Sequence, residues 1–316
     1  MLKKKAIRKM LITTMSLFII MTIYLIPLST EQEKMLPTNL ELEYITSLGN
    51  HSIYLLNENN YLVKTKILLD GKTLEENIKT MLRNLTIAKD SKFPNALKAI
   101  IPEKTKVNQV TVTDSIAVLD FSKEFLQIEK DKEEKMIEAI VYSLTGLKGV
   151  DGVTIKVEGE TLTKLPQSNK MLDPVLTRKI GINKRYDLTS TKDINKVVIY
   201  YTETIDDSSF YVPVTKYLND ARDKISIIIE ELTTSYIYEP NLSSLINENT
   251  VLLNQEQEDD LMILNFNDAL FDANGILKEE VLYTISYSVF DNYDVNTMAL
   301  YVNGKEASIV KKTDLP

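Results

Sequence analysis

The sequence predicts an α+β protein made of two tandem repeats behind an N-terminal transmembrane helix. Three observations support this prediction. Strand and helix patterns follow one order, β-β-α-β-β-α-β, and they do so twice along the 316 residues. A shift of 145 residues aligns 118–160 with 263–305 without a gap. An uncharged run, 10–28, directly follows a basic N-terminal tip.

The N-terminal run reads MLITTMSLFIIMTIYLIPL, and five basic residues but no acidic ones precede it. A helix of this length spans about 28 Å, close to the hydrocarbon thickness of a bilayer. Basic residues stay on the cytoplasmic side, so residues 31–316 are expected outside the cytoplasm. A cleaved signal peptide is the alternative, although the run is long for one and no A-x-A site follows it. We therefore expect a basic tip and membrane anchor over 1–30 and a linker over 31–50.

The first repeat is expected over 51–164. Runs of apolar and β-prone residues predict its strands, which are 53–57, 61–69, 106–113, 115–121 and 153–158. The capping box Thr73-Leu-Glu-Glu76 starts the first helix, because Thr73 can accept from the backbone while Glu76 reaches back. Apolar residues three and four apart, from Ile137 to Leu147, predict the second helix.

The second repeat, 196–310, follows an interdomain linker, 165–195. Its expected strands are 197–202, 210–218, 250–255, 261–266 and 297–303. An apolar stripe from Ile225 to Leu232 predicts one helix, and Leu277–Phe290 predicts the other.

The repeats are interpreted as an internal duplication. Nine of the 43 aligned positions are identical, and Tyr142-Ser143 meets Tyr287-Ser288. Upstream, Tyr61–Lys66 resembles Tyr211–Lys216 at a shift of 150. Two unrelated α/β domains of similar size are the alternative. The duplication predicts two helices on one face of a small sheet in each repeat, and it predicts equivalent buried positions, which are Leu119, Phe121, Ile140, Leu144, Leu264, Phe266, Ile285 and Val289.

Composition excludes several functions. The net charge is -8, and without the five basic residues near the N-terminus it falls to about -13 for residues 31–316. Nucleic-acid binding needs a clustered basic surface, so we expect no nucleic-acid partner. The chain has no cysteine and one histidine, which excludes disulfides, thiol catalysis, a lipidated cysteine and any site that needs two histidines.

Polar residues crowd one strand end, where active sites often lie. Asp120, Ser122, Lys123 and Glu124 stand there in the first repeat, and the aligned residues of the second repeat are Asn265, Asn267, Asp268 and Ala269. Two carboxylates are lost between the repeats, which argues against a duplicated catalytic acid. We interpret these residues as turn and helix-start groups that bond nearby backbone N–H groups.

Three other features are interpreted in structural terms. His51 is placed in the linker before the first strand and has no second histidine or cysteine as a partner. Asp272-Ala-Asn-Gly275 resembles a fragment of a calcium loop but lacks its regular spacing, which favours a turn. The acidic run Glu256–Asp260 reads as a solvated hairpin turn. We therefore expect no catalytic, cofactor-binding or metal-ligating residues, and no cofactor.

The stretch VLDFSKEFL (118–126), the helix after it and YSLTGLKGVDGVTIKVEGE (142–160) resemble the GerMN domain. The phrase Leu176-Thr-Arg-Lys-Ile-Gly-Ile-Asn183 is similar to the segment between the two domains of GerM-like proteins. The resemblance covers about 53–305 and is fainter in the second repeat, where Asp291-Asn-Tyr-Asp294 replaces the usual Leu-Pro-Gly phrase.

The resemblance implies a protein of sporulation and spore germination. GerM-like proteins are associated with the assembly that joins mother cell and forespore across the space between their membranes, and their domains are similar to the ring-building folds of export machines. They are not known as enzymes. The familiar form is a lipoprotein, whereas this chain has no cysteine to lipidate, so its anchor would be the helix itself.

The leading hypothesis is therefore a membrane-anchored, non-enzymatic structural or interaction protein. Its expected partners are other proteins of the sporulation assembly and further copies of itself, without a small-molecule substrate. A cell-wall or small-ligand binding module is the alternative, with a wall hydrolase behind it.

The anchor leads to a first prediction. The mature chain should keep Met1–Leu28 and stay in the membrane pellet after a high-salt wash, because a spanning apolar helix is not released by salt. Fractionation and N-terminal sequencing measure this, and a soluble product that begins near Glu31 would contradict it.

Overall fold

The computed structural model describes residues 50–90, 92–205, 208–234 and 241–315. The expected anchor at 10–28 and the expected linker up to residue 49 lie outside the described residues. Within these four ranges, no helix is both long and apolar enough to cross a bilayer.

The first repeat contains the seven expected elements in the expected order. They are β1 (Asn50–Leu56), β2 (Leu62–Leu68), α3 (Leu74–Leu85), β3 (Val107–Thr113), β4 (Ile116–Phe121), α4 (Glu133–Leu144) and β5 (Gly152–Val157), and a short β6 (Glu160–Thr161) follows. Thr73 caps α3 by accepting from the N–H of Glu76 at 3.2 Å. The Glu76 carboxylate reaches back to the N–H of Lys72, one residue before the position expected.

The second repeat has the same order and one further strand. It comprises β8 (Ile194–Ile205), β9 (Ser208–Asn219), α5 (Lys224–Thr233), β10 (Leu252–Glu258), β11 (Leu261–Phe266), α6 (Glu279–Asn292), β12 (Thr297–Val302) and β13 (Lys305–Lys311). The interpretation of the acidic run as a turn is only partly correct. Cross-strand pairing continues to Glu258, so Asp259 and Asp260 alone connect β10 to β11.

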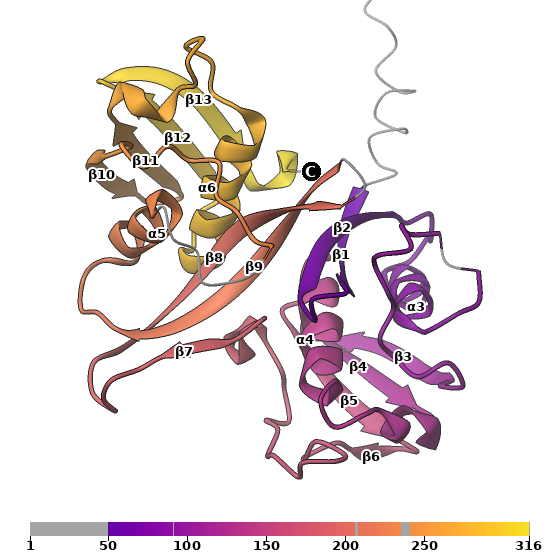
Figure 1. The fold of residues 1–316 in the computed structure, drawn as a ribbon. Coiled ribbons are helices and arrows are strands. Elements are labelled where there is room, and N and C mark those ends of the chain that lie inside the picture. The colour runs from indigo at the N-terminus through magenta and orange to yellow at the C-terminus, as the bar shows by residue number, and fades with distance from the viewer. Residues whose placement is uncertain (1–49, 91, 206–207, 235–240, 316) are drawn as a thin grey trace, which may run out of the picture. The chain divides into compact units, whose positions relative to one another are not determined.

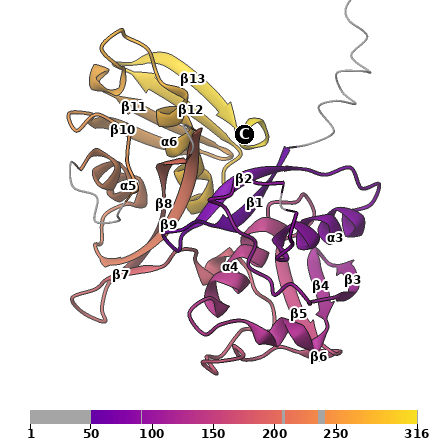
Figure 2. The same ribbon diagram turned by 45° about the vertical axis from the view of Figure 1, so that its right-hand side comes forward.

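The strands form three sheets (Figures 1 and 2). Each repeat contributes one four-stranded sheet, β3-β4-β5-β6 or β10-β11-β12-β13. The two N-terminal hairpins and β7 (Arg185–Asp187) share a five-stranded sheet, in which β2 and β7 both pair with β9.

The prediction of two helices on one face of a single small sheet is therefore wrong. The strands of each repeat are divided between two sheets, and α4 contacts β1 of the hairpin as well as β5 of the four-stranded sheet. Ten of the twelve residues of α4 are buried. A helix that is buried around most of its circumference needs packing partners on two sides, which a single sheet cannot supply.

Strand register confirms the duplication. Phe121 pairs with Val157 in the first repeat, and Phe266 pairs with Val302 in the second, which is the same pair shifted by 145. A register irregularity between residues 107 and 109 of β3 recurs between residues 252 and 254 of β10. The next turn also repeats, with positive φ at Glu158-Gly159 (50° and 84°) and at Asn303-Gly304 (50° and 77°). Such φ pairs are typical of a two-residue hairpin turn.

The hairpins follow a slightly different shift from the one predicted. Tyr54 pairs with Lys64, and Tyr200 pairs with Pro213. Since Tyr54 and Tyr200 occupy equivalent places, Lys64 corresponds to Pro213 at a shift of 149, and the predicted shift of 150 is wrong. The two hairpin loops differ in length, so a comparison of sequences alone does not fix this register.

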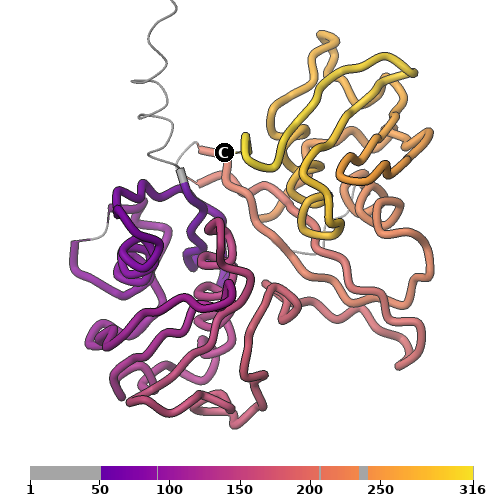
Figure 3. The backbone as a smooth tube through the Cα atoms, turned by 180° about the vertical axis from the view of Figure 1, so that it is seen from behind, coloured from indigo at the N-terminus to yellow at the C-terminus, as the bar shows by residue number. Residues whose placement is uncertain are grey.

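The segment between the repeats is part of the fold (Figure 3). Leu176 pairs with Val153 of β5, as Val310 of β13 pairs with Met298 of β12. The fourth strand of the first sheet is thus interrupted after β6 and resumes at Leu176. Before that point, the N–H groups of Gln167 and Ser168 donate to the carboxylate of Glu133, at 2.7 and 3.0 Å, and this pair of bonds holds the intervening loop on α4.

The eight predicted core residues are all buried. The exposed fraction is 0% for Leu119, Phe121, Ile140, Leu144, Leu264, Phe266, Ile285 and Val289. The ring of Phe121 also stacks on Phe125 with 4.5 Å between ring centroids.

Truncation of this ring provides a second prediction. Phe121→Ala should lower the free energy of unfolding by about 3–5 kcal/mol, because it removes buried apolar contacts and leaves a cavity. Urea denaturation of the full chain in a neutral detergent measures the change. Ile309→Ala serves as the control, since Ile309 is 54% exposed and its truncation should have little effect. A folded Phe121→Ala chain of unchanged stability would contradict the burial.

Candidate functional site: the joint between the repeats

The polar residues at the strand end serve as turn groups in both repeats. Oδ1 of Asp120 accepts from the N–H of Gly159 at 2.9 Å, and Oδ1 of Asn265 accepts from the N–H of Gly304 at 3.0 Å. An amide thus fills the place of a carboxylate with the same hydrogen bond. The negative charge of Asp120 is not needed for this role, which confirms the interpretation as turn chemistry.

Their neighbours also bond the backbone. Oγ of Ser122 accepts from the N–H of Lys106 at 3.0 Å, and Oδ1 of the equivalent Asn267 accepts from the N–H of Val251 at 2.9 Å. The hydrogen bond from Ser122 lowers the pKa of Glu124. Lys123 donates its backbone N–H to Glu158, while Asp268 and Ala269 lie in a short 3₁₀ turn. Ser122 and Asn267 thus fix the backbone beside the strand end in the same way in both repeats.

The other candidate features have structural places. The Asp272 carboxylate accepts from the N–H groups of Asn274 and Ile276, both at 2.9 Å, which confirms a turn. The placement of His51 in a linker is wrong: it lies in β1 opposite Ile67, because hairpin pairing begins at Asn50. Burial lowers the pKa of His51. In the part of the chain that the structure describes, no three His, Asp or Glu side chains group closely enough to hold a metal ion.

Buried polar groups instead gather where the two hairpins meet, a region that we call the joint. Strand β2 pairs antiparallel with β9 at Lys64 and Tyr211. In antiparallel strands the numbering runs in opposite directions, so the next facing residues are Val63 and Val212. The hairpin registers make these two valines equivalent, and both are 0% exposed.

Equivalent residues also meet their own counterparts across the joint. The hydroxyls of Tyr54 and Tyr200 lie 3.2 Å apart, and Nδ2 of Asn57 donates to Oε2 of Glu203 at 2.6 Å. Each tyrosine is placed in the same way, because Tyr54 donates its N–H to Ser143 of α4 and Tyr200 donates its N–H to Ser288 of α6. The joint is therefore a local two-fold contact within one chain, like the self-complementary interface of a symmetric dimer.

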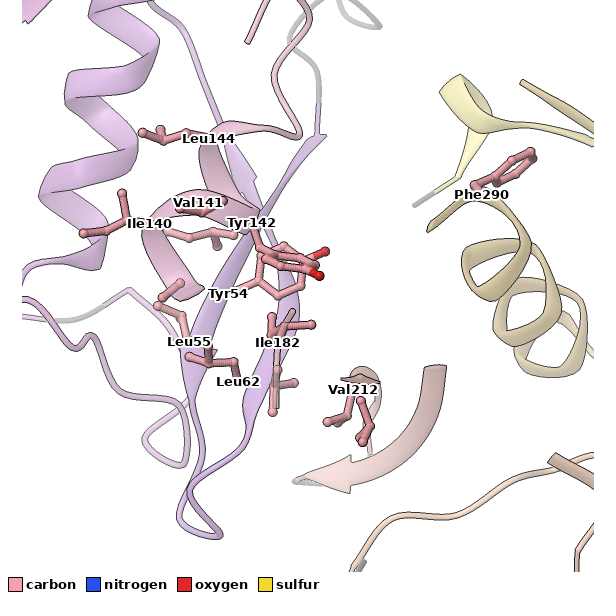
Figure 4. Packing of buried hydrophobic residues seen from close by; sticks show 14 of the residues in the cluster. Tyr54, Leu55, Leu62, Ile140, Val141, Tyr142, Leu144, Ile182, Val212 and Phe290 are labelled. Atoms are coloured by element: carbon pink, nitrogen blue, oxygen red, sulfur yellow. The ribbon is translucent and has the colours of Figure 1, made fainter. Parts of the chain in front are cut away.

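Apolar side chains surround the joint. Figure 4 shows Tyr54 and Tyr142 side by side, with Ile182 close to them. The rings of Tyr54 and Tyr142 pack edge to face at 5.7 Å. Lys64 extends over the ring of Tyr287, with Nζ 3.7 Å from the centroid. Burial lowers the pKa of Lys64 to about 7, although the ring face itself favours the charged form.

Asn183 completes the pairing between the hairpins. By the register of the joint, Leu62 faces Pro213, which has no N–H to donate. The Asn183 side chain lies at this point, where its Nδ2 donates to the carbonyls of Leu62 and Pro213 at 2.8 and 2.7 Å. Its Oδ1 accepts from the N–H of Leu62 at 2.9 Å. One side-chain amide thus supplies the donor and the acceptor that a second strand would offer.

A buried carboxylate holds Asn183 in place. Oε2 of Glu138, which is 1% exposed, accepts from the N–H of Asn183 at 3.0 Å. Its other oxygen pairs with Nζ of Lys184 at 2.8 Å. Although burial opposes it, the Glu138 charge raises the pKa of Lys184, so the Lys184 ammonium stays charged. Such networks are stable only when every member has partners.

Arg178, five residues before Asn183 in the linker phrase, connects the linker to α6 of the second repeat. Its guanidinium forms an ion pair with Asp291 of α6 and donates to Oγ1 of Thr145 at 3.0 Å. Oδ2 of Asp291 accepts from the hydroxyl of Tyr200 at 2.7 Å. Burial opposes the charge on Arg178, but the Asp291 carboxylate outweighs it and raises the pKa. The linker phrase 176–183 therefore fastens both repeats through Arg178 and Asn183.

The sequence gives little sign of these roles. Arg178 and Asn183 stand in the linker phrase 176–183, but a single sequence does not reveal which distant residues they contact. One signal was present in the sequence: Tyr54 and Tyr200 are both tyrosines, and they occupy equivalent positions of the two repeats at a shift of 146.

The family described as Germane, sporulation and spore germination, matches residues 52–163 and 198–308. The spore germination protein GerM of Bacillus subtilis (strain 168) is 28% identical over 295 residues, which are 90% of this chain and 79% of that protein. The solved tandem GerMN domains of the sporulation protein GerM from Bacillus subtilis match with a TM-score of 0.75 at 26% identity. That match covers 83% of this chain and 96% of the other.

Removal of the Asn183 amide provides a third prediction. Asn183→Gly should lower the free energy of unfolding by about 2–3 kcal/mol, because it leaves buried backbone groups of Leu62 and Pro213 without partners. Glycine is chosen because φ of Asn183 is 48°, which glycine adopts without strain. Urea denaturation measures the loss.

Asn169→Gly is the matched control. Asn169 also has a positive φ, 57°, but it lies on an exposed loop, so its change should stay within about 0.5 kcal/mol. Equal effects of the two substitutions would show that the amide bonds of Asn183 do not hold the joint.

Proposed function

Because the chain belongs to the Germane family of sporulation and spore germination proteins, we propose that it is a non-enzymatic structural component of a sporulation assembly. In this proposal the uncharged run 10–28 anchors the chain, and residues 31–316 lie in the space between mother cell and forespore. There the tandem repeats contact other assembly proteins and further copies of the chain.

The joint is the observation that carries this proposal. The buried groups Glu138 and Asn183 and the partly buried ion pair of Arg178 and Asp291 are engaged in holding one repeat against the other. A scaffold depends on a fixed spacing between its contact surfaces, and a joint with satisfied buried polar groups provides one. The carboxylates of Asp120 and Asp272 accept backbone N–H groups in turns.

Strand β10 is a suitable contact surface. It is an edge strand of its sheet, with six of its seven residues exposed, and it ends beside the acidic pair Asp259 and Asp260. An edge strand offers unpaired backbone groups for strand addition, and its carboxylates select a basic partner.

A specific cavity favours the alternative function, a cell-wall or small-ligand binding module. It has a volume of about 960 Å³ and lies in the first repeat, between the β1–β2 turn, the end of α3 and residues 92–102. Asn60, Asn84, Asn95 and Phe93 are among its lining residues. Amide groups beside an aromatic ring suit a sugar, so retention of the chain on purified wall material would favour this alternative.

A complementation experiment tests the proposal and is the fourth prediction. A deletion strain that carries Asp120→Asn, Glu124→Gln, Asp268→Asn or Asp272→Asn should still form heat-resistant spores, because a lone surface carboxylate contributes little to a scaffold. The double change Glu256→Lys with Glu258→Lys should abolish them, because it reverses the charge of the β10 edge.

Blots and membrane fractionation check protein level and anchoring for every variant. Glu103→Lys, on an exposed turn outside β10, is the control and should be tolerated. A stable, anchored carboxylate variant without activity would instead favour an enzyme or a ligand-binding protein.

A further inference from the structure

A hollow of about 280 Å³ opens at the joint beside the ion pair of Arg178 and Asp291. Both repeats and the linker contribute to its walls. The lining includes Tyr142 from α4, Arg178 and Lys179 from the linker, Lys196 from β8, Lys224 from α5 and Asp291 from α6. The hollow therefore exists only when the repeats are docked.

The charge of this hollow is opposite to that of the protein. Arg178 and Asp291 neutralise one another, which leaves Lys179, Lys196 and Lys224 as an excess of positive charge. Among the described residues, no carboxylate forms an ion pair with any of these three lysines. The whole chain carries a net charge of -8, so three cations around one opening are unexpected on composition alone.

The neighbouring protein groups do not neutralise the positive charge of the three lysines. Nζ of Lys196 donates to the carbonyls of Arg178 and Lys179, at 3.2 and 2.8 Å, which places the ammonium but does not neutralise it. The Asp291 carboxylate is directed into the joint, where its two oxygens accept from Arg178 and from the hydroxyl of Tyr200.

The surroundings of Lys196 agree with an uncompensated positive field. Burial lowers the pKa of Lys196, and the neighbouring charges of Lys224, Lys184 and Lys179 act in the same direction, against Asp291. An anion in the hollow would relieve this repulsion. The first N–H groups of α5 do not take part, since Asp223 already caps that helix through the N–H of Ile225.

We propose that the hollow binds a compact oxyanion, a phosphate or carboxylate group, between Lys179, Lys196 and Lys224. Its volume of about 280 Å³ is ample for one such group together with its remaining water. A polymer or a lipid headgroup would insert only its anionic group. The site does not depend on the proposed function, and a bound anion would connect Lys179 of the linker to Lys196 and Lys224 of the second repeat.

Calorimetry and thermal unfolding of the full chain in a neutral detergent test the site at constant ionic strength. Three probes distinguish the chemistry: inorganic phosphate, acetate, and glycerophosphoglycerol as a soluble phosphodiester of the lipid-headgroup type. We expect saturable one-site binding of at least one probe and a rise in Tm with its concentration. The probe that binds most tightly identifies the source of the anionic group.

The double variant Lys179→Gln with Lys224→Gln should weaken this binding at least about tenfold, because it removes two charge-assisted contacts. Lys196 is left unchanged, since it braces the linker. Lys305→Gln with Lys311→Gln, two exposed lysines of β13, is the control and should bind like the unchanged chain. The absence of saturable binding by all three probes, or equal weakening in the two double variants, would overturn the proposal.

Discussion

The architecture depends on one missing hydrogen-bond donor. Where β2 meets β9, the strand of the second repeat carries Pro213, so continuous strand pairing cannot form there. The Asn183 amide replaces it, with two donated bonds and one accepted bond to backbone groups of both strands. Asn183 is held in turn by Glu138 of α4, so the second helix of the first repeat determines how the hairpins can pair.

This constraint also explains why the segment between the repeats is ordered. A freely moving connector could not position a side-chain amide within hydrogen-bond distance of two strands. The segment is fixed at Leu176 by pairing with β5, at Arg178 by α6, and at β7 by pairing with β9. These attachments lie on both sides of Asn183, which limits the backbone positions that it can take.

The sequence was a good guide to elements that depend on local patterns. Alternation and helical spacing identified the strands and helices of both repeats, and the gapless shift of 145 identified the equivalence of Phe121 and Phe266. The division of each repeat into two sheets was not foreseen, because the side-chain pattern of a strand tells which residues are buried but not which sheet it joins. The sequence of α4 contained a hint, because apolar or small residues cover most of its circumference and such a helix needs packing partners on more than one side.

The contacts of the joint could not be predicted from the sequence for a different reason. Several of its contacts join residues more than 100 positions apart, such as Arg178 with Asp291 and Leu62 with Asn183. Polar residues of this kind look like ordinary surface residues until the partner is known. Asp120 and Asn265 were the opposite case, because each accepts from a backbone N–H of its own repeat, at the same spacing of 39 residues.

The local two-fold symmetry at the joint has a consequence for any assembly that includes this chain. A surface that is complementary to itself is normally available for pairing two separate molecules, but here each hairpin already occupies the other within one chain. This self-complementary surface is therefore already used within the chain and is not free to pair two copies. The two four-stranded sheets differ at their edges. The sheet of the first repeat ends in the short, interrupted edge strand β6, whereas the sheet of the second repeat ends in the continuous strand β13. Contacts made through these two different edges would be head-to-tail, so a row of copies would have distinguishable front and back ends.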